Sequence, residues 1–136
     1  MSAKAILQGS TRIACSDHLD EFLTQTPGIM LAQLTTADGF EVAAAMRDPK
    51  KSSTAKLAAM SSSLHALCEA MVIESGLETS RNLIIESDDG HIVMMSIPKI
   101  KPAMSLMVVS DRSAILGHLL WATKNSTQTF SKLIDS

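Results

Sequence analysis

The 136-residue chain has very few aromatic residues, with no tyrosine, one tryptophan and three phenylalanines. A surface that stacks on nucleic-acid bases is built from aromatic rings, so base stacking is not expected. The chain also lacks a basic excess, because 12 Lys and Arg are set against 14 Asp and Glu and the formal charge is −2. Since phosphate-backbone binding requires a basic surface, nucleic acid is not an expected partner.

Cysteines and long apolar runs are also scarce. Two cysteines, Cys15 and Cys68, are too few for a disulfide-stabilised secreted domain. The longest uncharged apolar run, residues 113–123, has eleven residues and is too short to cross a bilayer. The apolar residues that follow Lys4 are too few for a signal-peptide core. We therefore expect a cytoplasmic protein without membrane insertion.

Hydrophobic residues make up 46% of the chain and include nine methionines, so a core of aliphatic side chains and methionine is expected. The length is typical of one domain. No internal repeat or linker divides the chain. We predict a single domain over residues 1–136, with a core at about 14–124 and flexible ends.

Local patterns predict eight elements in the order α-β-β-α-β-β-β-α. They are a helix that Ser16 or Asp17 begins, strands at 29–36 and 40–46, a helix at 54–75, strands at 83–87, 91–97 and 103–109, and a last helix that Ser110 or Asp111 caps and that frays after Lys124. Asp-Gly pairs at 38–39 and 89–90 predict two hairpins. Several strands are apolar on both faces and must be covered on both. We expect an α+β fold, with one antiparallel sheet and helices on both of its faces.

The helix at 54–75 carries two stripes of side chains on different faces. The large-residue stripe is Leu57, Met60, Leu64, Leu67 and Met71, which is expected to lie on the sheet. The small-residue stripe is Ala55, Ala59, Ser62, Ala66, Ala70 and Ile73. Small side chains let another helix approach closely, so this stripe predicts self-association, which Ala66→Glu would disrupt. The alternative is a solvated face that uses alanine for its helix propensity.

Several short strings, in their order, resemble the Roadblock superfamily, which includes dynein-associated Roadblock light chains and bacterial regulators of Ras-like GTPases. The strings are Pro-Gly-Ile at 27–29, Thr-Ala-Asp-Gly-Phe at 36–40, Leu-Ala-Ala-Met at 57–60, Leu-Ile-Ile-Glu at 83–86, Asp-Gly at 89–90 and Ser-Asp at 110–111. The resemblance extends from about Leu19 to Ala122. It implies a five-stranded antiparallel sheet with the long helix on one face and the terminal helices on the other.

The resemblance also implies a function and an interface. Family members dimerise through the long helices and the following edge strands, which adds Leu83 and Ile85 to the small-residue stripe as expected dimer contacts. It implies a non-catalytic homodimer, without cofactor or metal, that binds a small Ras-like GTPase. The alternative is a structural adaptor subunit of a larger complex. Expected contacts for the partner are Arg47, Lys56, Ser63 and Arg81, and a guanidinium among them would suit charge stabilisation on a transferring phosphate.

Other chemistry has weaker support in the sequence. Cys15 and His18, with His65 and Cys68, have the residue types of a tetrahedral zinc site, but coincidence is the favoured interpretation. The acidic residues Glu86, Asp88 and Asp89 fall on a predicted turn, where Asp-Gly serves the backbone. No nucleophile elbow, phosphate loop or dinucleotide-binding motif is present. No catalytic residue is therefore expected.

Overall fold

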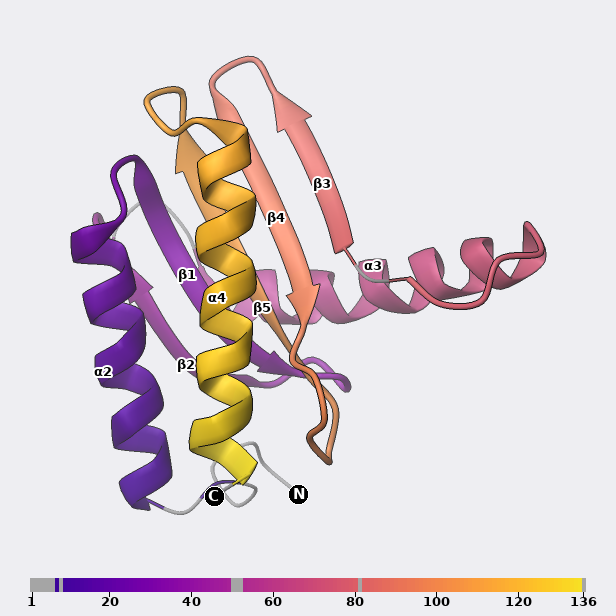
Figure 1. Ribbon diagram of the computed structural model, residues 1–136, viewed down its shortest axis with the longest axis horizontal. Helices are drawn as coiled ribbons and strands as arrows, with labels where there is room; N and C mark the ends of the chain where they lie inside the picture. Colours follow the sequence, from indigo (N-terminus) through magenta and orange to yellow (C-terminus); the bar gives the residue numbers. More distant parts are fainter. Residues whose placement is uncertain (1–6, 8, 50–52, 81, 136) are drawn as a thin grey trace.

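The computed structural model describes residues 7, 9–49, 53–80 and 82–135. The elements are α2 (Gly9–Gln25), β1 (Ile29–Thr36), β2 (Glu41–Met46), α3 (Thr54–Glu74), β3 (Asn82–Ser87), β4 (Gly90–Ser96), β5 (Met104–Asp111) and α4 (Leu116–Asp135). The strands form one antiparallel sheet in the order β2-β1-β5-β4-β3. Helices α2 and α4 lie side by side on one face, and α3 crosses the strands on the other (Figure 1). The expected α+β fold is confirmed.

The first and last helices differ from the sequence-based boundaries. Helix α2 begins at Gly9 rather than at Ser16. Its early turns carry Cys15 into the core, which gives this stretch a packing role that its weak apolar pattern did not indicate. Helix α4 begins at Leu116, because β5 continues to Asp111 and the Asp111 carboxylate then accepts hydrogen bonds from the Ser113 amide and hydroxyl.

Helix α4 does not fray after Lys124 but continues to Asp135. The polar residues that suggested a loose end are partly buried, and several threonine hydroxyls bond to carbonyls of the same helix. Thr123 donates to the Leu119 carbonyl at 2.7 Å and Thr127 to the Lys124 carbonyl at 2.6 Å. Phe130 is fully buried beyond them. The residues after Lys124 therefore form a packed helix although their composition is polar.

The main core lies between the sheet and the α2–α4 layer. Its fully buried large side chains include Leu19, Ile29, Leu34, Leu119 and Phe130. The His18 ring meets Phe130 edge-on, with ring centroids 4.9 Å apart, and its Nε2 shares a hydrogen bond of 3.3 Å with the Ser126 hydroxyl. These contacts join α2 to α4.

The opposite face of the sheet has a smaller core, and here one expectation is wrong. Only part of the large-residue stripe meets the sheet: Leu57 and Leu64 pack against a cluster of Leu31, Met94 and Met107. Met60, Leu67 and Met71 are 54%, 59% and 62% exposed. The buried residues of α3 are Ala58 and Ser61, whose small side chains allow close approach. Because α3 crosses the strands, its C-terminal part passes beyond β3 and away from the sheet (Figure 1).

Candidate protein interface

Strand β3 ends the sheet, and among the described residues it pairs with β4 alone. The two-residue turn at Asp88 and Asp89 makes Ser87 and Gly90 a hydrogen-bonded pair. The backbone groups of alternate residues then point away from β4, at Asn82, Ile84 and Glu86. The Ile84 side chain is 43% exposed. This edge is free to pair with another strand.

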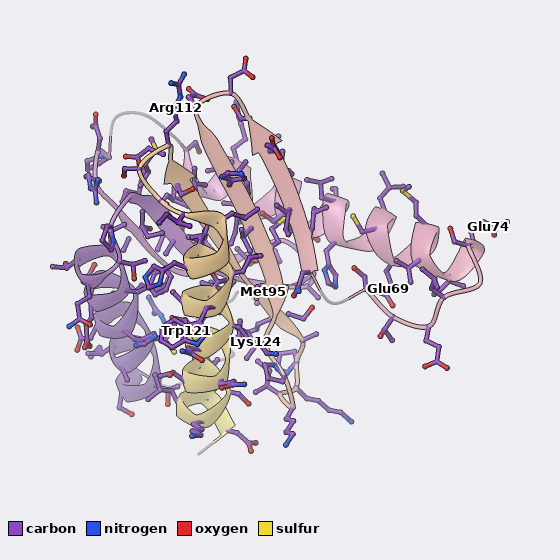
Figure 2. The ribbon with its side chains drawn as sticks, turned by 45° about the horizontal axis from the view of Figure 1, so that its top comes forward. Glu69, Glu74, Met95, Arg112, Trp121 and Lys124 are labelled. Atoms are coloured by element: carbon purple, nitrogen blue, oxygen red, sulfur yellow. The ribbon has the colours of Figure 1, made fainter. Side chains whose placement is uncertain are left out.

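Beyond β3, α3 carries exposed apolar side chains with no sheet beneath them. Leu67, Met71, Ile73 and Leu77 are each 59–64% exposed. Figure 2 shows Glu74 at the far end of α3, while Glu69 lies nearer the sheet. The Glu69 carboxylate accepts a hydrogen bond of 3.2 Å from the Ser80 amide, which ties the connection to β3 back to α3. We call residues 67–77 the α3 overhang, and its exposed apolar side chains make it a candidate interaction surface.

The same face of the sheet is open near the β3–β4 hairpin. A hollow of about 210 Å³ is lined by Ile85, Ile92 and Val109, which we call the open floor. It adjoins a second hollow of about 400 Å³. Met30, Leu31, Met46 and Val109 line that hollow together with the charged residues Arg47, Asp48, Asp89 and Asp111. Apolar surface on the sheet is thus left without a helix above it.

The two stripes of α3 lie on different sides of the helix. On one side, the Ser62 hydroxyl donates to the Ala37 carbonyl at 2.5 Å, and a Cβ added to Gly39 would lie 3.4 Å from Ser62 Cβ. This side meets the β1–β2 turn of its own chain. On the other side, Leu57 and Leu64 pack against the Leu31, Met94 and Met107 cluster, which Val109 of the open floor also contacts. The large-residue stripe therefore borders the open floor, and the small-residue stripe faces away from it.

The expected site residues lie in several places. Ala55, Ala59, Ala66, Ala70 and Ile73 are exposed on α3, and Ser62 is half-buried. Leu83 and Ile85 are half-buried on β3. Lys56 and Ser63 are exposed on α3, whereas Arg47 follows β2 at the larger hollow, which neither of them lines. Arg81 lies outside the described residues.

The charged rim of the larger hollow is held in place by hydrogen bonds. The Ser113 hydroxyl and amide both donate to Asp111 Oδ1, and they hold the pKa of this carboxyl below its usual value, with a smaller contribution from the positive charge of Arg47. Asp111 therefore stays ionised at neutral pH. Its backbone amide also bonds the Gly28 carbonyl at 2.8 Å. The rim is thus a structured loop beside an apolar hollow.

The alternative sites are not assembled. Cys15 and His18 lie on α2 and His65 and Cys68 on α3, so the sheet separates the two pairs (Figure 1). Within the described ranges, no group of three or more His, Cys, Asp or Glu could hold a metal ion. Asp88 and Asp89 form the β3–β4 turn, where the Asp88 carbonyl accepts from Arg112 Nε at 3.0 Å and Asp89 accepts from the Ser87 hydroxyl. In the part of the chain that is described, no helix is long and apolar enough to cross a membrane.

The geometry is that of a sheet with a free edge, an overhanging helix and an open floor. A family model described as the Roadblock/LC7 domain matches residues 16–110. The chain belongs to the Roadblock/LC7 family. The resemblance inferred from short strings is thereby confirmed.

Solved structures agree with this Roadblock/LC7 assignment. The chain is similar to gliding protein MglB from Thermus thermophilus, with 19% identity, a TM-score of 0.83, and coverage of 95% of this chain and 94% of that one. MglB from Myxococcus xanthus has 15% identity, a TM-score of 0.82 and coverage of 95% and 93%. A Roadblock/LC7 domain from Streptomyces avermitilis has 17% identity, a TM-score of 0.77 and coverage of 89% and 98%. At these identities the likeness establishes the fold. No significant match to a curated protein was found.

Sequence reasoning missed three features of this candidate interface. The first is the exposure of Leu67 and Met71, which their periodicity had placed on the sheet. The second is Leu77, an apolar residue two positions after Ser75, the C-cap of α3. The third is the open floor, which forms only when β3, β4 and β5 lie together. The one signal available in the sequence was the length of α3, which exceeds the width of a five-stranded sheet.

Proposed function

We propose that this Roadblock/LC7 chain is a homodimeric regulatory partner of a small Ras-like GTPase and has no catalytic centre of its own. The observation that carries the proposal is the free β3 edge beside the apolar α3 overhang. A second copy has the same edge and the same overhang. A twofold axis can therefore pair the two β3 edges and cover both overhangs at the same time. The family resemblance supports the GTPase as the further partner.

The β3 edge favours one register for the dimer. Antiparallel pairing centred on Ile84 places Ile84 against the partner's Ile84. Asn82 then lies opposite the partner's Glu86, and Leu83 opposite the partner's Ile85. Every outward backbone donor and acceptor at 82, 84 and 86 gains a partner in this register. The result is a ten-stranded sheet in which Leu83, Ile84 and Ile85 face apolar residues and Asn82 faces Glu86.

The same axis brings the α3 overhang of each chain to the open floor of the other. The 21 residues of α3 span about 31 Å, whereas four gaps between five strands span about 19 Å. About 12 Å of helix therefore extends past β3, which is enough to cross two strands of the partner. Because α3 passes the start of β3, the axis sends the partner's α3 past the hairpin end, over Ile85 of β3 and Ile92 of β4 (Figure 1).

This arrangement refines the predicted dimer contacts. The two α3 helices pass each other with their large-residue stripes, Met60, Leu64, Leu67 and Met71, closest to the axis. Leu83 and Ile85 stay at the centre of the interface. Ala55, Ala59, Ser62, Ala66, Ala70 and Ile73 lie toward its outer side, with Ser62 already bonded to Ala37. A charged substitution at Leu67 is therefore expected to weaken the dimer more than the same substitution at Ala66.

The GTPase is proposed to bind across the paired helices and the loops beside them. Lys56 and Ser63 are exposed on α3, and Arg47 is exposed at the hollow that the partner's α3 end would approach. Arg81 stays a candidate outside the described residues. A surface that combines two chains would recognise a partner only after dimerisation. Binding of the GTPase is therefore expected to depend on the dimer.

Two measurements test the proposal. Light scattering over a wide concentration range should give about twice the chain mass of 14.6 kDa. The immobilised protein should then capture a Ras-like GTPase of the same organism from purified candidates, each loaded with GDP or with a GTP analogue that is not hydrolysed. Capture that depends on the nucleotide supports the regulator. A persistent monomer overturns the homodimer, and nucleotide-independent capture of other subunits supports the structural adaptor instead.

A further inference from the structure

The second free edge of the sheet is β2, at the end opposite to β3. In the described part of the chain, β2 pairs with β1 alone. The Arg47 amide donates to the Met30 carbonyl at 2.9 Å, and Ala45, two residues earlier, pairs with Ala32. The backbone groups of Ala45 and Arg47 therefore both point toward β1. The backbone groups of Ala44 and Met46 must therefore point away from β1. Residues 43–46 contain neither lysine nor proline, the residues that usually protect an edge.

A groove runs beside this edge on the α2 face of the sheet. It has a volume of about 410 Å³ and lies between α2 and β2. Its lining residues are Gly9, Arg12, Ile13 and Ser16 from α2 with Glu41, Val42 and Ala43 from β2. Ile13 is 64% exposed at its border. Side chains of a strand added to β2 would alternate between this groove and the other face of the sheet.

Arg12 gives the groove a charge preference. Its Nε is buried, and among the residues that the structure describes it has no hydrogen-bond acceptor. A buried donor without an acceptor is costly, and a carboxylate is its strongest partner. Glu41, the acidic residue of the same groove, is turned elsewhere: it accepts from Gln33 Nε2 at 3.2 Å, and Gln33 also donates to the Thr54 carbonyl at the start of α3. No side chain in the described ranges therefore neutralises Arg12, and a carboxylate from a partner would do so.

We propose that the β2 edge and this groove bind an extended acidic peptide of another protein, which pairs with Ala44 and Met46 as a sixth strand and places a carboxylate on Arg12. This mode of recognition combines main-chain hydrogen bonds with alternate side-chain pockets. A second copy of the chain fits less well, because Glu41 is the only acidic residue of β2 and Gln33 already holds it. The site lies at the far end of the sheet from β3, so the proposed dimer leaves it free.

The test uses a fluorescein-labelled peptide of alternating Val and Asp, with a Val and Asn peptide of equal length as the neutral control. Fluorescence anisotropy should show tighter binding of the acidic peptide. Arg12→Gln should weaken that binding by about tenfold and leave the neutral peptide unaffected. Ala44→Pro should also weaken it, because proline removes an outward amide while keeping the β1 ladder intact. Amide shifts on adding the acidic peptide should map to residues 43–47.

Other results overturn the proposal. Equal binding of the two peptides by the unaltered protein would remove the role of Arg12. Shifts confined to β3 or α4 would place the site elsewhere. A mass that Ala44→Pro lowers without any peptide would show β2 pairing with a second copy. Circular dichroism confirms the fold of each variant, and the Arg12→Gln comparison decides the question if Ala44→Pro does not fold. None of these results depends on the GTPase.

Discussion

The hydroxyl of Ser62 donates a hydrogen bond of 2.5 Å to the carbonyl oxygen of Ala37 and fastens the middle of α3 to the β1–β2 turn. Gly39 of that turn has φ +96 and faces Ala59 and Ser62 of α3. A helix that crosses the strands has few contacts to fix its rotation. This one bond helps decide which side of α3 meets the sheet and which stays open.

Ser62→Ala should lower the free energy of unfolding by about 0.5–1.5 kcal/mol, because the Ala37 carbonyl loses its side-chain donor. Urea denaturation measures the change. Ser63→Ala is the matched control, since the Ser63 hydroxyl bonds the Ala59 carbonyl within the helix and ties α3 to nothing else. Equal losses in the two variants would show that the contact with the turn contributes no stability.

Leu67→Glu should convert the proposed dimer to a monomer, because a carboxylate would enter the apolar centre of the interface unpaired. Light scattering at several concentrations measures the mass. Ala66→Glu should weaken the dimer less, because Ala66 belongs to the small-residue stripe. Asn125→Glu adds the same charge to exposed α4, on the other face of the sheet, and should leave the mass unchanged. A stronger effect of Ala66→Glu would return the small-residue stripe to the centre of the interface.

His18 should make stability fall with acid. Burial lowers the pKa of His18 below its ordinary value of 6.5, although the nearby Glu21 carboxylate acts in the opposite direction. The unfolded chain therefore binds a proton more readily than the folded one as the pH falls below 6.5, and stability decreases until the folded pKa is passed. Urea denaturation at about pH 7.5 and about pH 5.5 measures the loss.

The matched variants for this pH effect are His18→Gln and His118→Gln. His18→Gln removes the titrating ring and should reduce the acid loss. His118 is exposed on α4, where it stacks on Trp121 with ring centroids 5.8 Å apart, and His118→Gln serves as the control for replacing a histidine outside the core. An unchanged profile in His18→Gln would assign the acid loss to other groups.

Gly28→Ala should destabilise the protein for two reasons. Gly28 has φ +86, which costs a residue with a side chain about 1–2 kcal/mol. An added Cβ would also lie 2.8 Å from the Ala114 backbone nitrogen. Gly76 has nearly the same φ, +85, but nothing within 4 Å of an added Cβ, so Gly76→Ala incurs the conformational cost alone. Thermal denaturation should show the larger loss for Gly28→Ala, and equal losses would mean that the loop between β5 and α4, which contains Ala114, moves aside.

The elements with strong local signals could be predicted from the sequence. Ser53 caps α3 by accepting from the Lys56 amide at 3.3 Å, and α3 begins and ends within a residue of the expected bounds. The turns at Gly39 and Gly90 join the expected strand pairs. Such signals depend on a residue and its near neighbours, which is why they can be read without knowledge of the packing.

The features set by packing could not be predicted in this way. Periodicity groups Met60, Leu64, Leu67 and Met71 on one side of α3, but it does not say whether that side meets the sheet. The direction in which α3 crosses the strands decides this, and it leaves Leu67 exposed and Leu64 half-buried. The β2 groove likewise needs Arg12 and Ala43 brought together from separate elements.

The two cysteines have opposite chemical accessibility. Cys15 is fully buried, and burial raises its thiol pKa from 9.0 to about 11, so almost no thiolate exists at neutral pH. Cys68 is half-buried on α3, one residue from Leu67. A maleimide added to the native protein should therefore label Cys68 and leave Cys15 unlabelled. The rate at which Cys68 is labelled should therefore report whether a second copy covers the α3 overhang. If dilution separates the two copies, the labelling of Cys68 should become faster.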